Sequence, residues 1–302
     1  MPSALAPPPG TQPPAALEAH GLYKAFAGRT VLHKLDWRIE PGRVVGLLGK
    51  NGAGKTTLLR CLLGLSPLDG GSVWLFGEAM REPGGERLHR IGFVPQSFDL
   101  FPWLKVAAYL DFTAAFYPRW NHALAARLLS QWALDPRQKI GQLSQGQRQK
   151  LAIVRAIAPE PDLLVLDEPV ASLDPQARRA FMDELLALMR HPGRTVIFST
   201  HITADLERAE ADIALLRDGQ IPFVRPLAEL RARFRRVLLT RDGGWSAAPA
   251  IPGAHHARID GACLQLLVED PPPGSLEALA AREQATLQVE TPSLEDLFVE
   301  LA

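Results

Sequence analysis

Continuous apolar runs recur through the first 225 residues of this chain. Three of them, at residues 43–48, 162–166 and 195–200, are dominated by valine, leucine, isoleucine and phenylalanine. Such runs predict parallel strands that are buried on both faces of a sheet. Residues 31–39 instead alternate apolar and polar positions and stop before Pro41-Gly42, which predicts strands followed by a turn. The pattern favours an α/β fold.

Shorter strand patterns complete this part of the chain. Residues 72–76 and 90–94 predict two further strands. The Asp218-Gly219 pair lies between two short apolar stretches within residues 212–224 and predicts a hairpin.

Helical spacing of apolar residues marks the segments between the strands. Asn121 is the expected N-cap of one helix, and Ser144 with Gln147 three positions later has the capping-box pattern ahead of another. The inner faces carry Leu124, Leu128 and Trp132 in the first helix and Leu151, Val154 and Ala158 in the second.

The two ends of the chain differ from its centre. Residues 1–18 are rich in proline and lack the basic start and apolar core of a signal peptide, so we expect a disordered, partly extended tail. From residue 226 on, strand-like runs alternate with helix-like stretches that begin at Ser275 and Ser293. We therefore expect a main domain over 19–225 and a small α+β domain over 226–302.

Composition excludes several classes of protein. Lysine plus arginine and aspartate plus glutamate are equal at 33 each, so no strong field draws the 302-residue chain toward nucleic acid. Two cysteines, Cys61 and Cys263, are too few for a disulfide framework and indicate a reducing compartment. No apolar run approaches the roughly 20 residues that a membrane span requires. These features predict a cytoplasmic protein.

A glycine-rich segment directly after the strand at 43–48 is the most specific motif. It consists of Gly49, Lys50, Asn51, Gly52, Ala53, Gly54, Lys55, Thr56 and Thr57. Glycines let the backbone approach a polyphosphate closely, and the N–H groups of the loop and of the following helix start attract phosphate oxygens. Lys55 adds a full charge at the β- and γ-phosphates, and the Thr56 hydroxyl is a ligand for Mg²⁺. The segment predicts a nucleoside triphosphate site.

Polar residues follow two of the buried runs. Asp167 and Glu168 close the run that begins at 162, and His201 follows the run at 195–200. Because ligands gather at the carboxyl ends of parallel strands, we expect Asp167 to hold Mg²⁺, directly or through water, and Glu168 to polarise an attacking water. The alternatives are an acidic turn that only caps a strand and a purely structural histidine.

Two further positions leave both a functional and a structural interpretation open. The helix start at Ser144 has no acidic residue nearby and is an anion site by geometry, but a plain N-cap has the same pattern. Gln96 follows the run at 90–94 and, taken alone, is an ordinary polar loop residue.

The ordered set of motifs resembles the nucleotide-binding subunit of ATP-binding cassette (ABC) transporters over roughly residues 19–225. Five motifs occur in the order of the family: the phosphate loop that ends at Lys55-Thr56, Gln96, the segment Leu143 to Gln147, Asp167-Glu168, and His201. The resemblance implies a P-loop NTPase cassette with a RecA-like core, an antiparallel β subdomain and a helical subdomain over about 97–158. It also implies ATP and Mg²⁺ as cofactors and ATP hydrolysis as the reaction.

The resemblance assigns roles to single residues. Phe26 stands where the family has an aromatic ring that stacks on adenine, with Tyr23 as the competing candidate. Gln96 is implied to contact Mg²⁺ or the attacking water and to link the site to a membrane partner. Glu168 is implied to be the general base, and His201 to contact the γ-phosphate.

The resemblance also implies a head-to-tail dimer, formed by two copies of this chain or with a paralogous cassette. Each ATP would lie between the phosphate loop of one chain and the helix start of the other, where Ser144, Gly146 and Gln147 contact it. Asp174 would communicate across the dimer. The chain departs from the family at Gln145, where the signature usually has a glycine, and this affects the backbone approach to the γ-phosphate.

The implied function is that of an ATPase that energises a membrane transporter through separate permease subunits, at the inner face of the cell membrane. The segment from Thr291 to Phe298 resembles the end of drug-exporter cassettes and favours export. One alternative, a cassette that acts on DNA or ribosomes, is disfavoured because one set of motifs and no heptad repeat occur. Another is a regulatory cassette that switches a membrane complex. The expected docking site for the membrane partner is the apolar cluster Phe98, Leu100, Phe101, Trp103 and Leu104.

Overall fold

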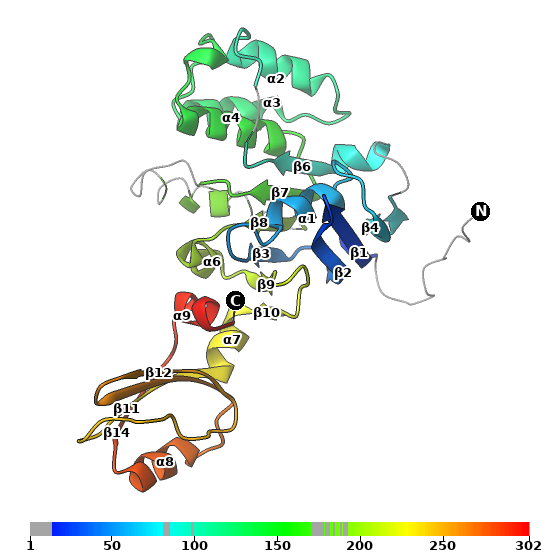
Figure 1. Cartoon of the computed structure of the whole chain (residues 1–302). Helices are drawn as coiled ribbons and strands as arrows, with labels where there is room; N and C mark the ends of the chain where they lie inside the picture. The colour runs from blue at the N-terminus through cyan, green and yellow to red at the C-terminus, as the bar shows by residue number, and fades with distance from the viewer. Residues whose placement is uncertain are drawn as a thin grey trace.

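The computed structural model describes residues 14–80, 85–97, 100–170 and 193–301, together with 178, 182–183, 185–187 and 189. The strands of these residues form three sheets. In Figure 1 the helices α2, α3 and α4 lie at one end of the molecule, and the third sheet lies at the other end.

A six-stranded sheet lies at the centre, in the order β10-β9-β3-β8-β7-β6. The strands are β3 Val44–Leu48, β6 Ile91–Val94, β7 Leu163–Asp167, β8 Thr195–Ser199, β9 Asp212–Leu215 and β10 Val224–Pro226. Neighbouring strands pair in parallel except β9 and β10, which are antiparallel. Every residue of β7 and β8 is buried, as their continuous apolar runs predict. The carboxyl ends of β3, β7 and β8 therefore meet at one edge of the sheet.

An antiparallel sheet in the order β2-β1-β4-β5 forms a second layer. Its strands are β1 Leu17–Phe26, β2 Arg29–Ile39, β4 Gly70–Leu75 and β5 Glu78–Ala79. Helix α1, Lys55–Leu62, buries Leu58, Leu59 and Leu62 in a core shared by residues of both sheets.

The disordered tail expected over residues 1–18 is too long at its C-terminal side. Ala15 and Ala16 are 1% and 2% exposed, and β1 begins at Leu17. The N–H of Ala16 donates to the carbonyl of Ile39, and the N–H of Phe76 donates to the carbonyl of Ala16. Pairing with two distant strands orders this segment, which no local pattern could reveal. Residues 1–13 lie outside the described part of the chain.

A helical block follows β6. It contains α2 Val106–Ala114, α3 His122–Gln131, the short 3-10 helix η2 Ile140–Gln142 and α4 Gln145–Ile157, and the 3-10 helix η1 Glu86–Arg90 precedes β6. Asn121 accepts a hydrogen bond from the N–H of Leu124 at 2.8 Å, which confirms the predicted cap of α3. The predicted capping box of Ser144 and Gln147 is also present at the start of α4.

The apolar cluster predicted after Gln96 divides between core and surface. Leu100 is buried and Leu104 packs against the core, whereas Phe101 and Trp103 are 40% and 67% exposed. Phe98 lies outside the described residues.

The third sheet has the order β12-β13-β11-β14 and is antiparallel. Its strands are β11 Phe234–Thr240, β12 Ala254–Asp260, β13 Cys263–Glu269 and β14 Thr286–Glu290. Helix α8, Ser275–Glu283, packs Leu276 and Leu279 into the core of this sheet.

Three helices connect this C-terminal unit with the central sheet. They are α6 Thr203–Ala209, α7 Leu227–Arg233 and α9 Leu294–Leu301. Leu294 and Leu297 of α9 are each 1% exposed and belong to the same core as Leu206 of α6. In Figure 1 the last helix of the chain accordingly lies between α6 and β12 of its own sheet.

Candidate functional site

The phosphate loop lies between the end of β3 and the start of α1. Gly52 and Gly54 have φ angles of 80° and 101°, in the region that favours glycine. A Cβ at Gly54 would lie 2.7 Å from the Val31 side chain, and a Cβ at Gly49 would lie 2.8 Å from the carbonyl oxygen of Leu216. The glycines are therefore needed both for the turn and for the close approach of neighbouring strands.

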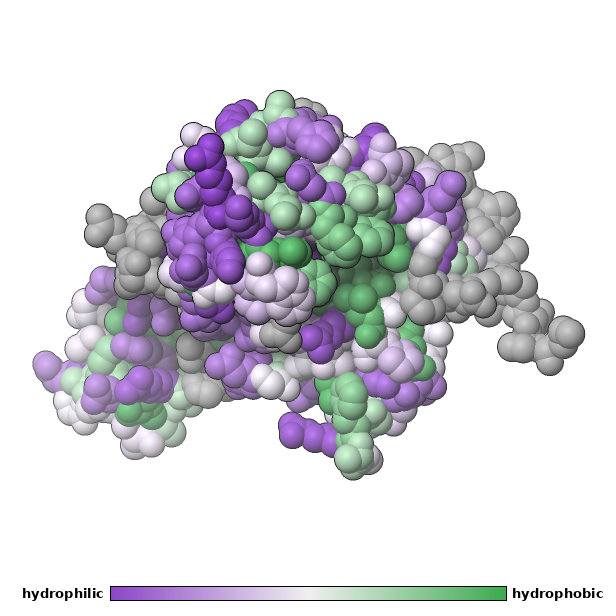
Figure 2. Space-filling model, turned by 90° about the horizontal axis from the view of Figure 1, so that it is seen from above, coloured by the Kyte–Doolittle hydropathy of each residue, from purple (hydrophilic) through white to green (hydrophobic). Residues whose placement is uncertain are grey.

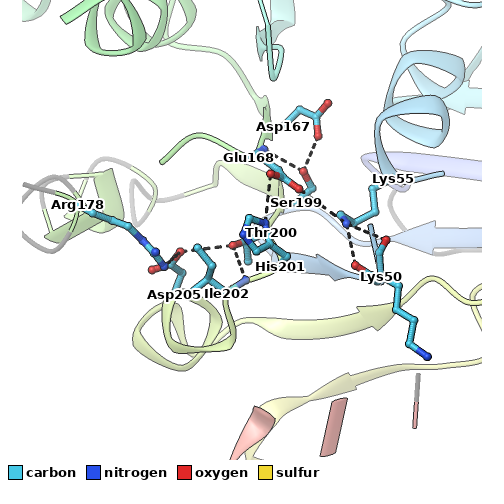
Figure 3. A network of polar contacts seen from close by, with 11 residues as sticks. Lys50, Lys55, Asp167, Glu168, Arg178, Ser199, Thr200, His201, Ile202 and Asp205 are labelled. Atoms are coloured by element: carbon cyan, nitrogen blue, oxygen red, sulfur yellow. Dashed lines mark hydrogen bonds and ion pairs between the residues drawn. The ribbon is translucent and has the colours of Figure 1, made fainter. Parts of the chain in front are cut away.

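Lys55, the first residue of α1, is 6% exposed. Its ammonium group donates to the carbonyl oxygens of Gly49 at 2.7 Å and Lys50 at 3.3 Å. Burial lowers the pKa of Lys55, an effect that the nearby charges of Glu168 and Asp167 oppose. The sequence thus places a desolvated cation inside the loop, where it faces the space that a phosphate would fill (Figure 3).

Asp167 ends β7 and is fully buried. Its Oδ1 accepts a hydrogen bond from the Ser199 hydroxyl at 2.6 Å, whereas its Oδ2 has no hydrogen-bond partner among the described residues. Buried carboxylate oxygens are normally satisfied, so an unpartnered one indicates a missing cation or water. The donor set of Asp167 Oδ2 with the Thr56 hydroxyl fits Mg²⁺, which prefers oxygen ligands.

Glu168 adopts a backbone conformation that is unusual for a residue other than glycine, with φ at 49°. Its N–H donates to the carbonyl and the hydroxyl of Ser199 at 3.2 and 3.0 Å, which holds the turn in place. The carboxylate is 10% exposed and lies 3.8 Å from the Lys55 ammonium and 3.3 Å from Nδ1 of His201. Such local strain is common at functional sites and costs on the order of 1–3 kcal/mol.

His201 lies in a short loop between β8 and α6, and its side chain is 43% exposed. The hydroxyl of the neighbouring Thr200 accepts from the N–H of Ile202 at 3.0 Å and donates to Asp205 at 3.4 Å. Asp205 in turn accepts from Arg178 at 2.9 Å. Burial raises the pKa of Asp205, and the positive charge of Arg178 counteracts this effect. Figure 3 shows this chain of contacts from Arg178 through Asp205 and Thr200 to the His201 loop.

The phosphate loop, Glu168 and His201 border a cavity of about 1020 Å³, whereas Gly49 and Asp167 are not among the described residues that line it. Among the predicted site residues that line it are Lys50, Asn51, Gly52, Ala53, Gly54, Lys55, Thr56, Thr57, Gln96, Glu168 and His201. A triphosphate in this cavity would therefore meet the loop, the carboxylate and the histidine together.

The sequence prediction missed a second group of residues that line the cavity. It consists of Arg29, Thr30, Val31 and His33 at the start of β2 and of residues 216–219 after β9. The N–H of His33 donates to the carbonyl of Gly219 at 2.9 Å, and a Cβ at Gly219 would lie 2.7 Å from the carbonyl oxygen of Val31. The sequence predicts both the Asp218-Gly219 turn and a strand over residues 31–39, but not the contact between them.

Phe26 is not among the described residues that line the cavity. It ends β1, is 50% exposed, and pairs in the ladder with Arg29, which does line it. The Lys24 ammonium lies 5.0 Å from the centre of the Phe26 ring. The hydroxyl of Tyr23, the competing candidate, lies 3.2 Å from that of Thr30. The adenine-stacking role stays a prediction for either residue.

Ser144, Gly146 and Gln147 also lie apart from the described residues that line the cavity. The Ser144 hydroxyl accepts from the N–H of Gln147 at 3.2 Å, and the Gln147 side chain accepts from the N–H of Ser144 at 2.9 Å. Ser144 and Gln145 are exposed at the helix start, and Gly146 and Gln147 are partly exposed. Asp174 lies outside the described residues.

Comparisons with known proteins agree on one family. The sequence profile of the family described as "ABC transporter" matches residues 32–171. The chain is 32% identical over 299 residues to the Nod factor export ATP-binding protein I of Burkholderia lata, with 96% of this chain and 97% of the relative covered. The protein of the same name from Burkholderia thailandensis is 32% identical over 304 residues, with 95% and 97% covered.

Solved structures give the same result. The ATP-binding subunit of an ABC transporter has a TM-score of 0.63 and 28% identity, covering 72% of this chain and 92% of that one. A dimeric bacterial ABC transporter cassette has a TM-score of 0.62 and 27% identity, with 70% and 98% covered. A cassette in a post-hydrolysis state bound to ADP and phosphate has a TM-score of 0.62 and 26% identity, with 70% and 98% covered.

Proposed function

The chain belongs to the ABC transporter family as an ATP-binding, ATP-hydrolysing subunit, and on that premise we propose that it powers export through separate membrane-spanning partners. The observation that carries the proposal is the convergence of Lys55 and Glu168 at one cavity, together with the buried, unpartnered Oδ2 of Asp167, the residue next to Glu168. Relatives that match nearly the whole chain are named as export ATP-binding proteins. No helix among the described residues is long and apolar enough to cross a membrane, so the proposal includes a partner that does.

The phosphate loop holds the triphosphate. The Lys55 ammonium, already inside the loop, exchanges its carbonyl acceptors for phosphate oxygens, and the N–H groups at the start of α1 add partial positive charge. Phe26 at the end of β1 is positioned to meet the base beside Arg29.

Asp167 Oδ2 and the Thr56 hydroxyl would hold Mg²⁺ next to the phosphates, with Gln96 at the same cavity. When bound, the ion neutralises charge on the β- and γ-phosphates. The support for this assignment is the buried oxygen of Asp167 that no described residue satisfies.

Glu168 orients and deprotonates the attacking water, because its carboxylate lies at the cavity with one oxygen near Lys55 and the other near His201. His201 contacts the γ-phosphate side. Its ring nitrogen lies 3.3 Å from Glu168, so a donated proton there would hold the carboxylate in one orientation.

Two cassettes close head to tail around the nucleotides. Ser144, Gly146 and Gln147 lie away from the cavity of their own chain, at an exposed helix start that favours anions. A partner's ATP is the ligand that this position fits. Asp174 is proposed to act across the same interface. One solved relative is described as dimeric.

A membrane partner docks on an exposed group of four rings in the helical block, here called the aromatic patch: Phe101, Trp103, Phe112 and Phe116. Their exposed fractions are 40%, 67%, 49% and 62%. The ring centre of Phe101 lies 5.5 Å from that of Trp103 and 5.8 Å from that of Phe112, and the rings of Phe112 and Phe116 lie 5.1 Å apart. Figure 2, viewed from the end that carries α2 and α3, shows apolar side chains gathered around a hollow on that face. A cytoplasmic helix of the partner is the expected occupant, since exposed aromatic clusters mark binding sites.

The test of the proposed chemistry is Glu168→Gln, which removes the base but keeps the size and hydrogen bonding of the side chain. ATP hydrolysis by the purified subunit should fall on the order of 10²–10⁴-fold while ATP still binds. The dimer should then accumulate in the presence of ATP, which light scattering would detect. Hydrolysis near the parental rate would assign the base to another residue.

A further inference from the structure

Helix α6 lies directly behind the His201 loop. It begins two residues after His201, and its Leu206 is fully buried against β3, the strand that leads into the phosphate loop. The fit is close, because a Cβ at Gly46 of β3 would collide with the Leu206 side chain. Because α6 follows the His201 loop directly in the chain, a displacement of α6 would also displace that loop.

One side of α6 holds that loop. Asp205 accepts from the Thr200 hydroxyl at 3.4 Å and from Arg178 at 2.9 Å, and Thr200 accepts from the N–H of Ile202 at 3.0 Å. The residues on both sides of His201 are thus tied to α6, as Figure 3 shows.

The other side of α6 holds the C-terminal unit. Oε1 of Glu207 accepts from the Arg231 guanidinium of α7 at 2.7 Å and from the N–H of Leu294 at 3.1 Å. Leu294 is the first residue of α9, and its N–H is one of the donors that a helix start leaves without an internal partner. The helix's own cap, Ser293 with Asp296, satisfies other donors of the same turn. Below this contact, Leu294 and Leu297 are buried beside Leu206 and Ala209.

We infer that Glu207 is a positioning residue for ATP hydrolysis: it fixes α6 to α7 and α9, so that docking of the C-terminal unit sets the position of His201 relative to Glu168. The inference rests on the role proposed for His201. It assigns the C-terminal unit to turnover rather than to nucleotide binding, because the contacts of Glu207 lead through α6 to the His201 loop, whereas Lys55 is held by the carbonyl groups of the phosphate loop itself.

Two substitutions at one position separate the contacts. Glu207→Ala removes both acceptor functions, whereas Glu207→Gln keeps an oxygen for the Leu294 N–H and loses the charge opposite Arg231. For the alanine variant we expect kcat to fall about 2-fold to 30-fold, with KM for ATP and ATP affinity unchanged. The glutamine variant should lie between the alanine variant and the parent. Glu277→Gln, on the exposed face of α8, is the matched control and should leave kcat unchanged.

Amide hydrogen exchange reports on the contacts of α6 themselves, which the turnover rate does not. In Glu207→Ala the amides of Leu294 and Ile202 should exchange faster, since the first loses its acceptor and the second lies in the released loop. Leu297→Ala, which loosens the docking of α9 without touching Glu207, should lower kcat in the same way. The double variant should lose less kcat than the product of the two separate fold-losses, because both substitutions act through one contact.

The inference is overturned if Glu207→Ala exposes the Leu294 amide and kcat stays at the parental value. It is equally overturned if kcat and ATP affinity fall together, because Glu207 then supports the fold and not the His201 loop. His201→Ala, measured in parallel, separates this result from the role proposed for His201. If that variant hydrolyses ATP normally, the proposed role of His201 fails; if only the Glu207 variants are neutral, the positioning role alone fails.

Discussion

Lys55 holds its charge inside the phosphate loop before any nucleotide is present. The ammonium group is bound to two carbonyl oxygens of the loop, and burial lowers its pKa. A cation that is already desolvated and oriented loses little further freedom when a phosphate arrives. The contact with ATP is therefore expected to be stronger than that of a lysine at the surface.

Lys55→Ala should weaken ATP binding about 10-fold to 150-fold, the loss expected for one charge-assisted hydrogen bond. Lys139→Ala removes an exposed lysine of the helical block and serves as the control. Isothermal titration calorimetry with ATP measures the ATP affinity of both variants. If the Lys55 variant binds ATP as tightly as the parent, the cavity is not the triphosphate site.

At the residue scale, local signals indicated several side chains that lie at one cavity in the structure. Lys55 and Glu168 were predicted at the site because the chemistry needs their side-chain types directly after buried strands, and both line the cavity. Arg29 and His33 were missed, because β2 reaches the cavity by a contact between His33 and Gly219, which are 186 positions apart in sequence. The unpartnered oxygen of Asp167 and the acceptor role of Glu207 likewise depend on packing that no spacing encodes.

Among whole elements, α4 illustrates what local signals can predict. Its start was predicted from Ser144 and Gln147 alone, because a capping box joins residues three positions apart. The predicted disordered tail extended too far, because the hydrogen bonds that order Ala16 are made with the distant residues Ile39 and Phe76. The signal at α4 fixes where the helix begins but leaves open which ligand its start would bind.

Ser144→Arg tests whether the start of α4 binds the ATP of the partner chain. A long cationic side chain at the helix start would occupy the place proposed for the partner's γ-phosphate, so turnover should be abolished while ATP affinity of the monomer stays unchanged. Ser144→Ala is the matched control, since it also loses the cap, at a cost of about 1 kcal/mol in stability, but adds no bulk. Both variants should therefore melt at similar temperatures and differ in turnover. Turnover by Ser144→Arg at the parental rate would refute the head-to-tail arrangement.

At the scale of the whole molecule, the exposed surfaces of the two ends differ. The C-terminal unit returns α9 to the ATPase core and buries Leu294 and Leu297 there. The helical block, at the opposite end of the molecule in Figure 1, instead carries the exposed aromatic patch. The sequence predicted a hydrophobic cluster after Gln96, but Phe112 and Phe116 joined it only in the fold, where Phe112 of α2 packs edge-on against Phe101 and Phe116 packs edge-on against Phe112.

Trp103→Ala should therefore weaken recovery of the tagged chain with the membranes of its own cells and spare ATP binding by the isolated subunit. Trp103 is the most exposed ring of the patch, so its removal leaves the core intact, whereas Phe101 also packs edge-on against the buried Tyr109. An aromatic anchor of an interface contributes at least about 2 kcal/mol, which corresponds to roughly thirtyfold in affinity. Leu65→Ala, at a residue 60% exposed and outside the patch, is the control and should fractionate like the parent.

If Trp103→Ala and Phe101→Ala both stay folded and are recovered with membranes as the parent is, the partner docks elsewhere. A parent chain that never associates with membranes would contradict the proposed transporter assembly itself, because ATP hydrolysis can drive export only through a partner that spans the membrane.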